Sequence, residues 1–488
     1  MSNDSGNLDQ LLSDLGLALH PDIAKHRKLT TKVARKPAQV ILRDDALAIS
    51  SSSSYICHAC LVASSATLLV CARCKSARYC SKKCQASDWK SGHKLACQLY
   101  VNYATDHDIA EADLLIKAIY KSDEASKSVA WMSFSKLMDH ANEFDDETTM
   151  EMKQTIDWVS QVSSHGPSDM MTYLGRFKSN NYAMYDPDLN IVGEGCFALA
   201  ALLNHSCHPN LCIEFEGRGM VVRCMTELTS GDELLVSYQD PMTPGTRRRL
   251  LLKENFDCTC IRCVKPDPII PALHGGFPYV DTLLTDADDP IDLHIVSNLI
   301  ADATNMPSYI PIFNNPNPTP PISPPLISYI STILPFMAPV IPPTSSQTTY
   351  LTKHHEIITT FITTPSDIYT LPTFIAASTL LTNQIESGKP QWLDVAILAM
   401  YAASTYLLVY ERYHPMVGLK FLLAGKALFN AAEDAKTQPE LRSMVLDAQV
   451  LVKLAKECLA VSHGYEGANG RVMKDVEEVE KAILIELS

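Results

Sequence analysis

Hydrophobic positions recur along the chain with two different periods, which separate helical from strand-rich parts. Between residues 98 and 179, runs such as ADLLIKAIY and SFSKLMDHANEF repeat apolar residues every three or four positions, which predicts amphipathic helices. Between residues 180 and 240 the alternation is typical of short strands, as in LCIEFE and GMVVRC, with Gly217 and Gly219 near an expected hairpin turn. From residue 349 onward amphipathic helices return, and such runs usually pack in stacked pairs. We therefore expect a multidomain α+β fold.

The stretch from residue 265 to 348 interrupts this pattern. Its later part, NNPNPTPPISPPLISYISTILPFMAPVIPP, contains so much proline that regular helix is excluded and an extended linker is expected. A spacer is the simpler interpretation. The alternative is a proline-rich ligand for an aromatic groove.

The composition is that of an ordinary globular protein with an acidic balance. The chain has 488 residues, 46% hydrophobic and 20% charged, and this length predicts two to four domains. It contains 41 Lys and Arg against 55 Asp and Glu, which gives a formal net charge of -14. This balance argues against a generally basic nucleic-acid-binding protein and favours a basic partner.

The N-terminus and the most apolar run bear on location. The N-terminal residues lack the basic and apolar regions of a secretory signal, which predicts an intracellular protein. The run from Val395 to Tyr410 lies between Asp394 and Glu411 and is too short to cross a bilayer, so we expect a buried helix and no membrane partner. In a reducing compartment the 15 cysteines are expected to be thiols or metal ligands.

Eight cysteine and histidine residues lie between residues 57 and 97 in short paired spacings. A structural zinc ion takes four such ligands, so the number predicts two ions, whereas buried free thiols have no reason to be paired in this way. Two pairings remain open, a sequential one and an interleaved one. The eight ligands are Cys57, Cys60, Cys71, Cys74, Cys80, Cys84, His93 and Cys97, and interleaving would join Cys57, Cys60, Cys80 and Cys84 on one ion.

A later cluster provides three more ligands, Cys258, Cys260 and Cys263. A closed zinc site needs a fourth ligand from elsewhere in the fold, and Cys207 in the loop-like run NHSCHPN is the best candidate. The alternative is an incidental or redox-active triplet. The other cysteines have no partner at ligand spacing and are interpreted as core thiols.

These motifs together resemble the SMYD family of protein-lysine methyltransferases. The eight-ligand pattern is similar to a MYND zinc finger, in which the family's pairing is interleaved. The runs NNYAMYDPD, NHSCHPN, GDELLVSY and FDCTCIRC resemble the second half of a SET domain, and KPAQVILRDDALA resembles its first strands. The resemblance implies a β-rich SET domain split by the finger, a helical insert and a C-terminal TPR-like helical lobe. It also implies S-adenosylmethionine (SAM) and three zinc ions as cofactors.

The expected domain boundaries follow from the resemblance and from the changes of pattern. They are an N-terminal tail at 1–20, an N-terminal SET half at 21–56, the MYND finger at 57–97, the helical insert at 98–179, the C-terminal SET core at 180–240, a post-SET zinc segment at 241–264, the proline-rich linker at 265–348 and the TPR-like lobe at 349–488.

Two short segments allow more than one interpretation. The leucine-rich run from Leu8 to Gly16 is either an ordinary tail helix that packs or frays, or an LD-type docking motif. The basic run from Arg247 to Arg249 is expected to be a solvated helix face and not a phosphate site.

The resemblance also implies roles for individual residues. Tyr238 would stand at the catalytic end of a lysine channel, and Tyr182 would be an aromatic residue of its wall. Methyl transfer is an in-line displacement that needs a neutral, positioned amine, and apolar channel walls lower the pKa of the lysine ammonium. The cofactor residues implied are Asn180, Asn204, His205, Phe256 and, on an expected helix, His140, for which a surface histidine is the alternative.

Two positions depart from the family pattern. Relatives have Gly-x-Gly where this chain has His26-Arg27-Lys28, so glycine's permissive backbone is missing near the cofactor. Relatives also commonly have Tyr where this chain has Glu254. The competing interpretation is a catalytically weak SET and MYND scaffold that recruits proline-rich protein partners, for example in transcriptional regulation.

The expected partners are proteins. The family implies a lysine substrate, either a histone tail or another protein, and proline-rich peptides bound by the finger, including this chain's own linker. Direct nucleic-acid binding is not expected, because it rests only on scattered basic residues of the finger. The family also implies a location in the nucleus, the cytoplasm or both.

Overall fold

The strands form where the alternating pattern predicts them. In the computed structural model, β10 (Leu211–Glu216) and β11 (Gly219–Cys224) coincide with the runs LCIEFE and GMVVRC. They pair antiparallel around a turn at Gly217, whose φ of 61° is one that glycine adopts without strain. On its other edge β11 pairs with β3 (Val40–Asp45), so strands from before and after the finger join in one sheet.

A second antiparallel sheet repeats this arrangement in the order β4-β8-β7. Its strands are β4 (Ala48–Ser51), β8 (Ile191–Cys196) and β7 (Asn181–Tyr185). Two short strands, β9 (Asn204–His205) and β12 (Leu235–Val236), pair in parallel. One apolar core contains buried side chains from these strands and from the segment between β8 and β9.

Side chains between Leu8 and Leu19 belong to this core, so the expected N-terminal tail is a packed part of the unit over these residues. α1 (Ser5–Asp14) places Leu8 and Leu12 one turn apart on the same face, and both are fully buried. β1 (Leu17–Asp22) pairs antiparallel with β2 (His26–Thr31). A docking motif would need its leucines exposed, so the packed helix is the interpretation that the structure bears out.

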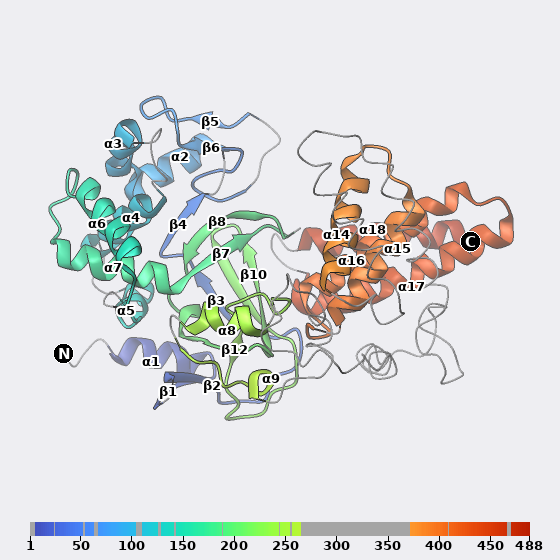
Figure 1. The fold of residues 1–488 in the computed structure, drawn as a ribbon, viewed down its shortest axis with the longest axis horizontal. Coiled ribbons are helices and arrows are strands. Elements are labelled where there is room, and N and C mark those ends of the chain that lie inside the picture. The colour runs from blue at the N-terminus through green and yellow to red at the C-terminus, as the bar shows by residue number, and fades with distance from the viewer. Residues whose placement is uncertain are drawn as a thin grey trace. The chain divides into compact units, whose positions relative to one another are not determined.

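Helices fill the finger and the insert that follows it. The finger contains β5 (Leu69–Val70), β6 (Arg78–Tyr79), α2 (Lys82–Asp88), a π-helical turn η1 (Trp89–His93) and α3 (Lys94–Tyr103); the insert contains α4 (Ala110–Glu124), α5 (Val129–Ser135), α6 (Asp146–Val159) and α7 (Pro167–Asn180). Ser81, Ser128 and Asp145 cap α2, α5 and α6 by accepting backbone N–H groups. Figure 1 shows α4, α6 and α7 gathered beside the finger.

The C-terminal part is helical and has its own core. After the short 3-10 helix η2 (Ala200–Leu202) and the strands come α8 (Gly245–Lys253), α9 (Ile261–Val264), α14 (Leu371–Glu386), α15 (Trp392–Leu407), α16 (Pro415–Ala431), η6 (Ala432–Asp434), α17 (Gln438–Ser462) and α18 (Gly470–Leu487). Each helix from α14 to α18 packs on the next. The apolar run that begins at Val395 is buried in this core, as expected.

The structure describes residues 5–23, 25–51, 54–62, 67–103, 110–124, 128–140, 143–187, 189–243, 245–253, 256–264, 371–407, 409–465 and 470–488. The proline-rich linker and Glu254 lie outside these ranges. The described residues fall into two units, the first covering 5–205 and 210–236 and the second covering 206–209 and residues from 237 onward. Within these ranges no helix has the length and apolar character of a membrane span. The predicted α+β, multidomain fold class is confirmed.

Candidate functional site

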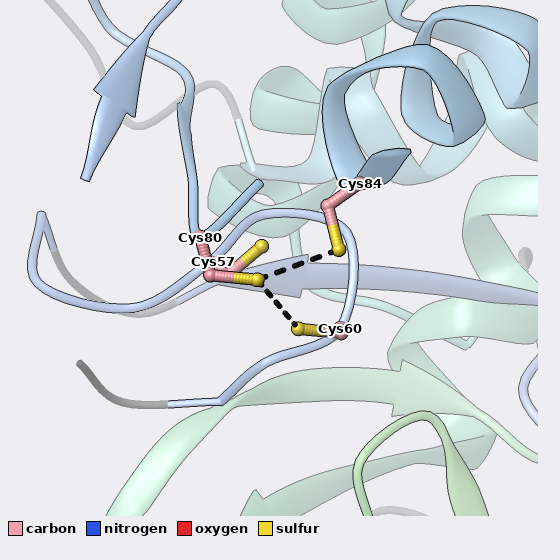
Figure 2. A group of neighbouring side chains, drawn as sticks. All are labelled: Cys57, Cys60, Cys80 and Cys84. Carbon is pink, nitrogen blue, oxygen red and sulfur yellow. Dashed lines mark hydrogen bonds between the residues drawn. The ribbon is translucent and has the colours of Figure 1, made fainter. Parts of the chain in front are cut away.

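The first cluster of candidate metal ligands joins two turns of the finger. It consists of Cys57, Cys60, Cys80 and Cys84. Figure 2 shows the four sulfurs pointing toward one another, with Cys80 Sγ 3.7 Å from Cys60 Sγ and 3.5 Å from Cys84 Sγ. Ser81 fixes the start of α2 by accepting the N–H of Cys84, which holds Cys84 one helical turn after Cys80.

The second cluster is fully buried and consists of Cys71, Cys74, His93 and Cys97. Cys71 Sγ lies 3.9 Å from Cys97 Sγ, and Cys74 Sγ lies 3.8 Å from His93 Nε2. His93 ends the π-helical turn η1, and Cys97 follows one turn later in α3. Of the two pairings that spacing left open, the structure therefore has the interleaved one.

The third cluster joins the loop after β9 to the cysteine-rich tail. It consists of Cys207, Cys258, Cys260 and Cys263. Cys207 Sγ lies 4.0 Å from Cys258 Sγ and 3.6 Å from Cys263 Sγ. Cys207 thus lies where the predicted fourth ligand of the triplet is expected.

All three clusters fit zinc. Sulfurs at the corners of a tetrahedron with Zn–S bonds of about 2.3 Å lie roughly 3.8 Å apart, which matches the distances above. Hydrogen bonding to Cys60 lowers the pKa of Cys57 to about 4 and raises that of Cys60, so one thiol of the pair ionises readily, and a bound zinc ion would displace the proton of the other. Each cluster offers four ligands, which is typical of a structural site without an open position.

Two buried arginines lie against the third cluster. Arg248 Nε donates to Cys207 Sγ at 3.0 Å, and its Nη1 donates to Pro241 O at 3.2 Å. Arg262 donates to Cys207 O at 3.1 Å and to Pro241 O at 2.9 Å. The expectation that Arg247 to Arg249 form a solvated face is therefore wrong at Arg248, which is 2% exposed. Its guanidinium is buried because it donates a charge-assisted hydrogen bond to the Cys207 sulfur.

The parallel pairing of β9 with β12 brings two distant motifs together. Asn204 and His205 of NHSC lie opposite Leu235 and Val236 of GDELLVSY. Asn204 Nδ2 donates to Arg27 O at 2.6 Å and to Glu233 Oε1 at 2.9 Å. With both amide protons used in this way, Asn204 Oδ1 is the atom that can accept a donor from a ligand.

The segment that departs from the family's Gly-x-Gly joins the same junction through β2. His26 has a φ of 60°, a left-handed conformation that glycine adopts freely and histidine does not. Lys25 Nζ binds the Glu233 carboxylate at 2.8 and 3.0 Å. His26 thus has a backbone conformation typical of glycine, and this conformation is strained for histidine.

Two further predicted residues flank the β4-β8-β7 sheet. Tyr182 in β7 is half-buried, donates from its hydroxyl to Ala200 O at 3.2 Å, and meets Phe197 edge-on at 6.2 Å between ring centroids. Asn180 ends α7, and its amide donates to Met138 O at 3.0 Å and Arg176 O at 2.9 Å. His205 is buried in β9.

His140 does not lie on a helix, which corrects that expectation. α5 ends at Ser135, where Arg176 donates to Ser135 O at 2.9 Å and to Leu137 O at 3.1 Å and so satisfies carbonyls beyond the helix. His140 follows in a loop with a φ of 46°, and its Nδ1 lies 2.9 Å from Glu143 Oε2. His140 is thus a local hydrogen-bond partner of Glu143.

Tyr238 and Phe256 lie in the second unit. Their rings meet edge-on with centroids 6.2 Å apart, and Tyr238 is 43% exposed. An exposed phenol beside an aromatic ring suits contact with a bound molecule better than core packing does.

Sequence reasoning missed several residues that support these sites. Arg248 and Arg262 at the third cluster were not recognised, and neither was the pair of Lys25 and Glu233. The position of Arg262 immediately before Cys263 is a local signal for it, whereas the other contacts join residues far apart in the sequence.

Comparisons with known proteins agree with the motifs. A family model described as MYND finger matches residues 57–97. The chain is 27% identical to "Histone-lysine N-methyltransferase SMYD3" of Mus musculus over 256 residues, which cover 49% of this chain and 59% of that protein. It is 29% identical to "N-lysine methyltransferase SMYD2" of Rattus norvegicus over 219 residues, covering 43% and 50%.

A plant protein shows a similar level of likeness. The chain is 26% identical to "Histone-lysine N-methyltransferase ASHR1" of Arabidopsis thaliana over 275 residues, covering 53% and 57%. The chain thus spans about half to three fifths of the length of these relatives. A solved structure entitled "Crystal structure of the SET domain of LSMT bound to Lysine and AdoHcy" aligns with 100% of this chain and 90% of its own, at 11% identity and a TM-score of 0.32, which is too low to assign a fold.

Proposed function

We propose, from its relationship to the SMYD family of SET and MYND domain-containing proteins, that this chain is a SAM-dependent protein-lysine N-methyltransferase. The observation that carries the proposal is the junction of β9 with β12, which holds NHSC beside GDELLVSY. Both runs are the ones that resemble the catalytic half of a SET domain.

The junction offers groups suited to the amino-acid end of SAM. Asn204 Oδ1 is an acceptor for an α-ammonium group, and the orientation of that amide is fixed by Arg27 O and Glu233. Lys25, held by Glu233, is a cation suited to a carboxylate. When bound, SAM supplies a methyl group on a sulfonium, which is electrophilic without further activation.

The chain's own task is to present a neutral lysine amine. The resemblance assigns Tyr238 to the catalytic end of the lysine channel, where its hydroxyl would orient the nitrogen lone pair. It assigns Tyr182 to the wall, and the anchoring of the Tyr182 hydroxyl on Ala200 O keeps its ring in one orientation. It assigns Phe256 to the adenine, on which the ring would stack.

The substrate proposed is a lysine on a protein, either a histone tail or another protein, and the proposed location is the nucleus, the cytoplasm or both. The formal charge of -14 supports a basic substrate. The finger is proposed to bind proline-rich peptides.

The strained backbone at His26 favours a second candidate, a scaffold with weak SAM binding. Calorimetric titration of zinc-loaded protein with SAM and with its demethylated product separates the two. The methyltransferase proposal expects saturable binding that Asn204→Ala removes and that Asn102→Ala, an exposed control, leaves intact. Absence of heat from folded protein supports the scaffold.

A further inference from the structure

One lysine of the insert lies buried between the finger and the SET sheet. Lys117 in α4 is 5% exposed. Its Nζ donates to Asp113 Oδ2 at 2.6 Å and to Ile49 O, in strand β4, at 2.7 Å. The same nitrogen lies 3.7 Å from Asp88 Oδ1, at the end of finger helix α2. A single ammonium therefore contacts three separate segments.

Asp88 continues this network to the second cluster. It is 3% exposed, and its Oδ2 accepts the hydroxyl of Tyr79 at 2.8 Å. The same oxygen lies 3.9 Å from His93 Nδ1. His93 faces Cys74 through Nε2, so Nδ1 is the ring nitrogen on the Asp88 side; at 3.9 Å the carboxylate acts on it through charge and not through a hydrogen bond.

The backbone at Gly92 brings the two elements into contact. Gly92 has a φ of 137°, and a Cβ there would lie 3.2 Å from Lys117 Cγ and 3.5 Å from the Lys117 Cα. A side chain would be strained by this φ and would press on α4. Glycine thus permits the close approach of η1 to α4 that Lys117 then exploits.

The first cluster is attached differently, through apolar packing. Its Cys57 is buried beside Ile56 of the sheet core, whereas Cys80 is exposed and Cys60 and Cys84 are half-buried. All four ligands of the second cluster are buried. Among the described residues, Lys117 pairs with Asp88 and Asp113, and Asp88 in turn lies near His93 of the second cluster. The two candidate ions of the finger are therefore attached to the rest of the unit in different ways.

We infer that Lys117 is a positioning residue that couples the second cluster's ion to strand β4, so that loss of this ion loosens the SET sheet whereas loss of the first cluster's ion does not. The sheet concerned, β4-β8-β7, also carries Tyr182. This coupling concerns the chain's structure and holds whether or not the proposed methyltransferase activity is correct.

Charge explains why the ammonium is needed. Three thiolates and one histidine on Zn²⁺ carry a formal charge of -1, and Asp88 and Asp113 add two more negative charges in a buried space. Burial alone would lower the pKa of Lys117, but the two carboxylates raise it above its ordinary value, so the lysine stays charged. Without it, the buried carboxylates of Asp88 and Asp113 would lose the positive charge that they share.

The first experiment measures zinc release to a chelator for Lys117→Met, Asp88→Asn and Lys90→Met. Lys90 is an exposed lysine of η1 and is the matched control. We expect one of three ions to leave about tenfold faster or more in the first two variants, since residues behind zinc ligands typically change affinity by this amount. Release at the control's rate from Lys117→Met overturns the inference.

The second experiment follows hydrogen exchange of the β4 amides, Ala48–Ser51, in variants that each lack one ligand. Cys74→Ser removes the second cluster's ion, and Cys84→Ser removes the first cluster's. We expect loss of β4 protection in Cys74→Ser and in Lys117→Met, with protection kept in Cys84→Ser. Equal protection in both cysteine variants overturns the inference. If Cys74→Ser fails to fold, the comparison of Lys117→Met with Lys90→Met decides.

Discussion

Replacing Arg248 with methionine is expected to weaken zinc binding at the third cluster and to leave the two finger ions in place. The side chain is 2% exposed, and its Nε lies 3.0 Å from Cys207 Sγ. Methionine has similar length and no charge, so the change removes the guanidinium without opening a large cavity. Arg249, an exposed neighbour on α8, provides the matched control as Arg249→Met.

The magnitude follows from the charges. Four thiolates on Zn²⁺ carry a formal charge of -2, and Arg248 with Arg262 supplies two positive charges. Burial lowers the pKa of Arg262 to about 10, which still leaves it protonated at neutral pH. Two opposite unit charges 3.0 Å apart attract each other by roughly 5.5 kcal/mol at an effective dielectric constant of about 20. Desolvation offsets much of this attraction, and hydrogen bonds to charged groups contribute about 1.5 to 3 kcal/mol net. This range predicts about 10- to 150-fold weaker zinc binding.

The assay is competition with a zinc-binding dye, followed as the number and rate of ions released. Cys258→Ser, which should bind one ion fewer, identifies the phase that belongs to the third cluster. Arg248→Met should accelerate this phase alone, and Arg249→Met should not. Equal release from Arg248→Met and wild type, or acceleration of all three phases together, would refute the argument.

Three further variants have separable outcomes. His26→Gly should raise the free energy of unfolding by up to about 1 kcal/mol, because it relieves a left-handed φ. Lys28→Gly, in the same strand, should instead lower this free energy by about 0.5 to 1 kcal/mol. Thermal unfolding measures both changes. Burial raises the pKa of Glu214 to about 8, above its unfolded value of about 4.3. The free energy of unfolding should therefore fall as pH rises between these values, by a few kcal/mol at most. Glu214→Gln should make the melting temperature less dependent on pH between pH 5 and 9. Tyr238→Phe should keep SAM binding and lose most methyl transfer from labelled SAM, and turnover equal to that of the control Tyr465→Phe would contradict the role assigned to Tyr238.

Local patterns predicted what depends on neighbours in the sequence. The strands Leu211–Glu216 and Gly219–Cys224 follow from alternation, because one face of each is covered by core. The zinc ligands follow from spacing, because each pair must bend around a single ion. Even Cys207 was identifiable, since three ligands require a fourth.

The remaining features depend on contacts between distant residues. The sequence did not single out Arg248 or Lys117, because the partners that tie them to the rest of the unit, Cys207 Sγ and Ile49 O, lie in distant segments. His140 was misplaced because Arg176, 36 positions later, satisfies the carbonyls at the end of α5. The burial of Leu8 and Leu12 likewise depends on a core built mainly from later residues.

The split sheets also set the order in which this chain can fold during synthesis. Leu42 pairs with Val222, about 180 residues later, and Ile49 pairs with Gly195. At roughly 5 to 20 residues per second, the early strands wait about 10 to 40 s on the ribosome before their partners emerge. The finger and the insert lie within that interval, and their helices α3, α4, α6 and α7 pack on one another, so they can fold before β8 and β11 are made. A nascent chain therefore exposes β3 and β4 as unpaired edges until residues 191–224 have been made, and this is a period in which chaperone binding would matter.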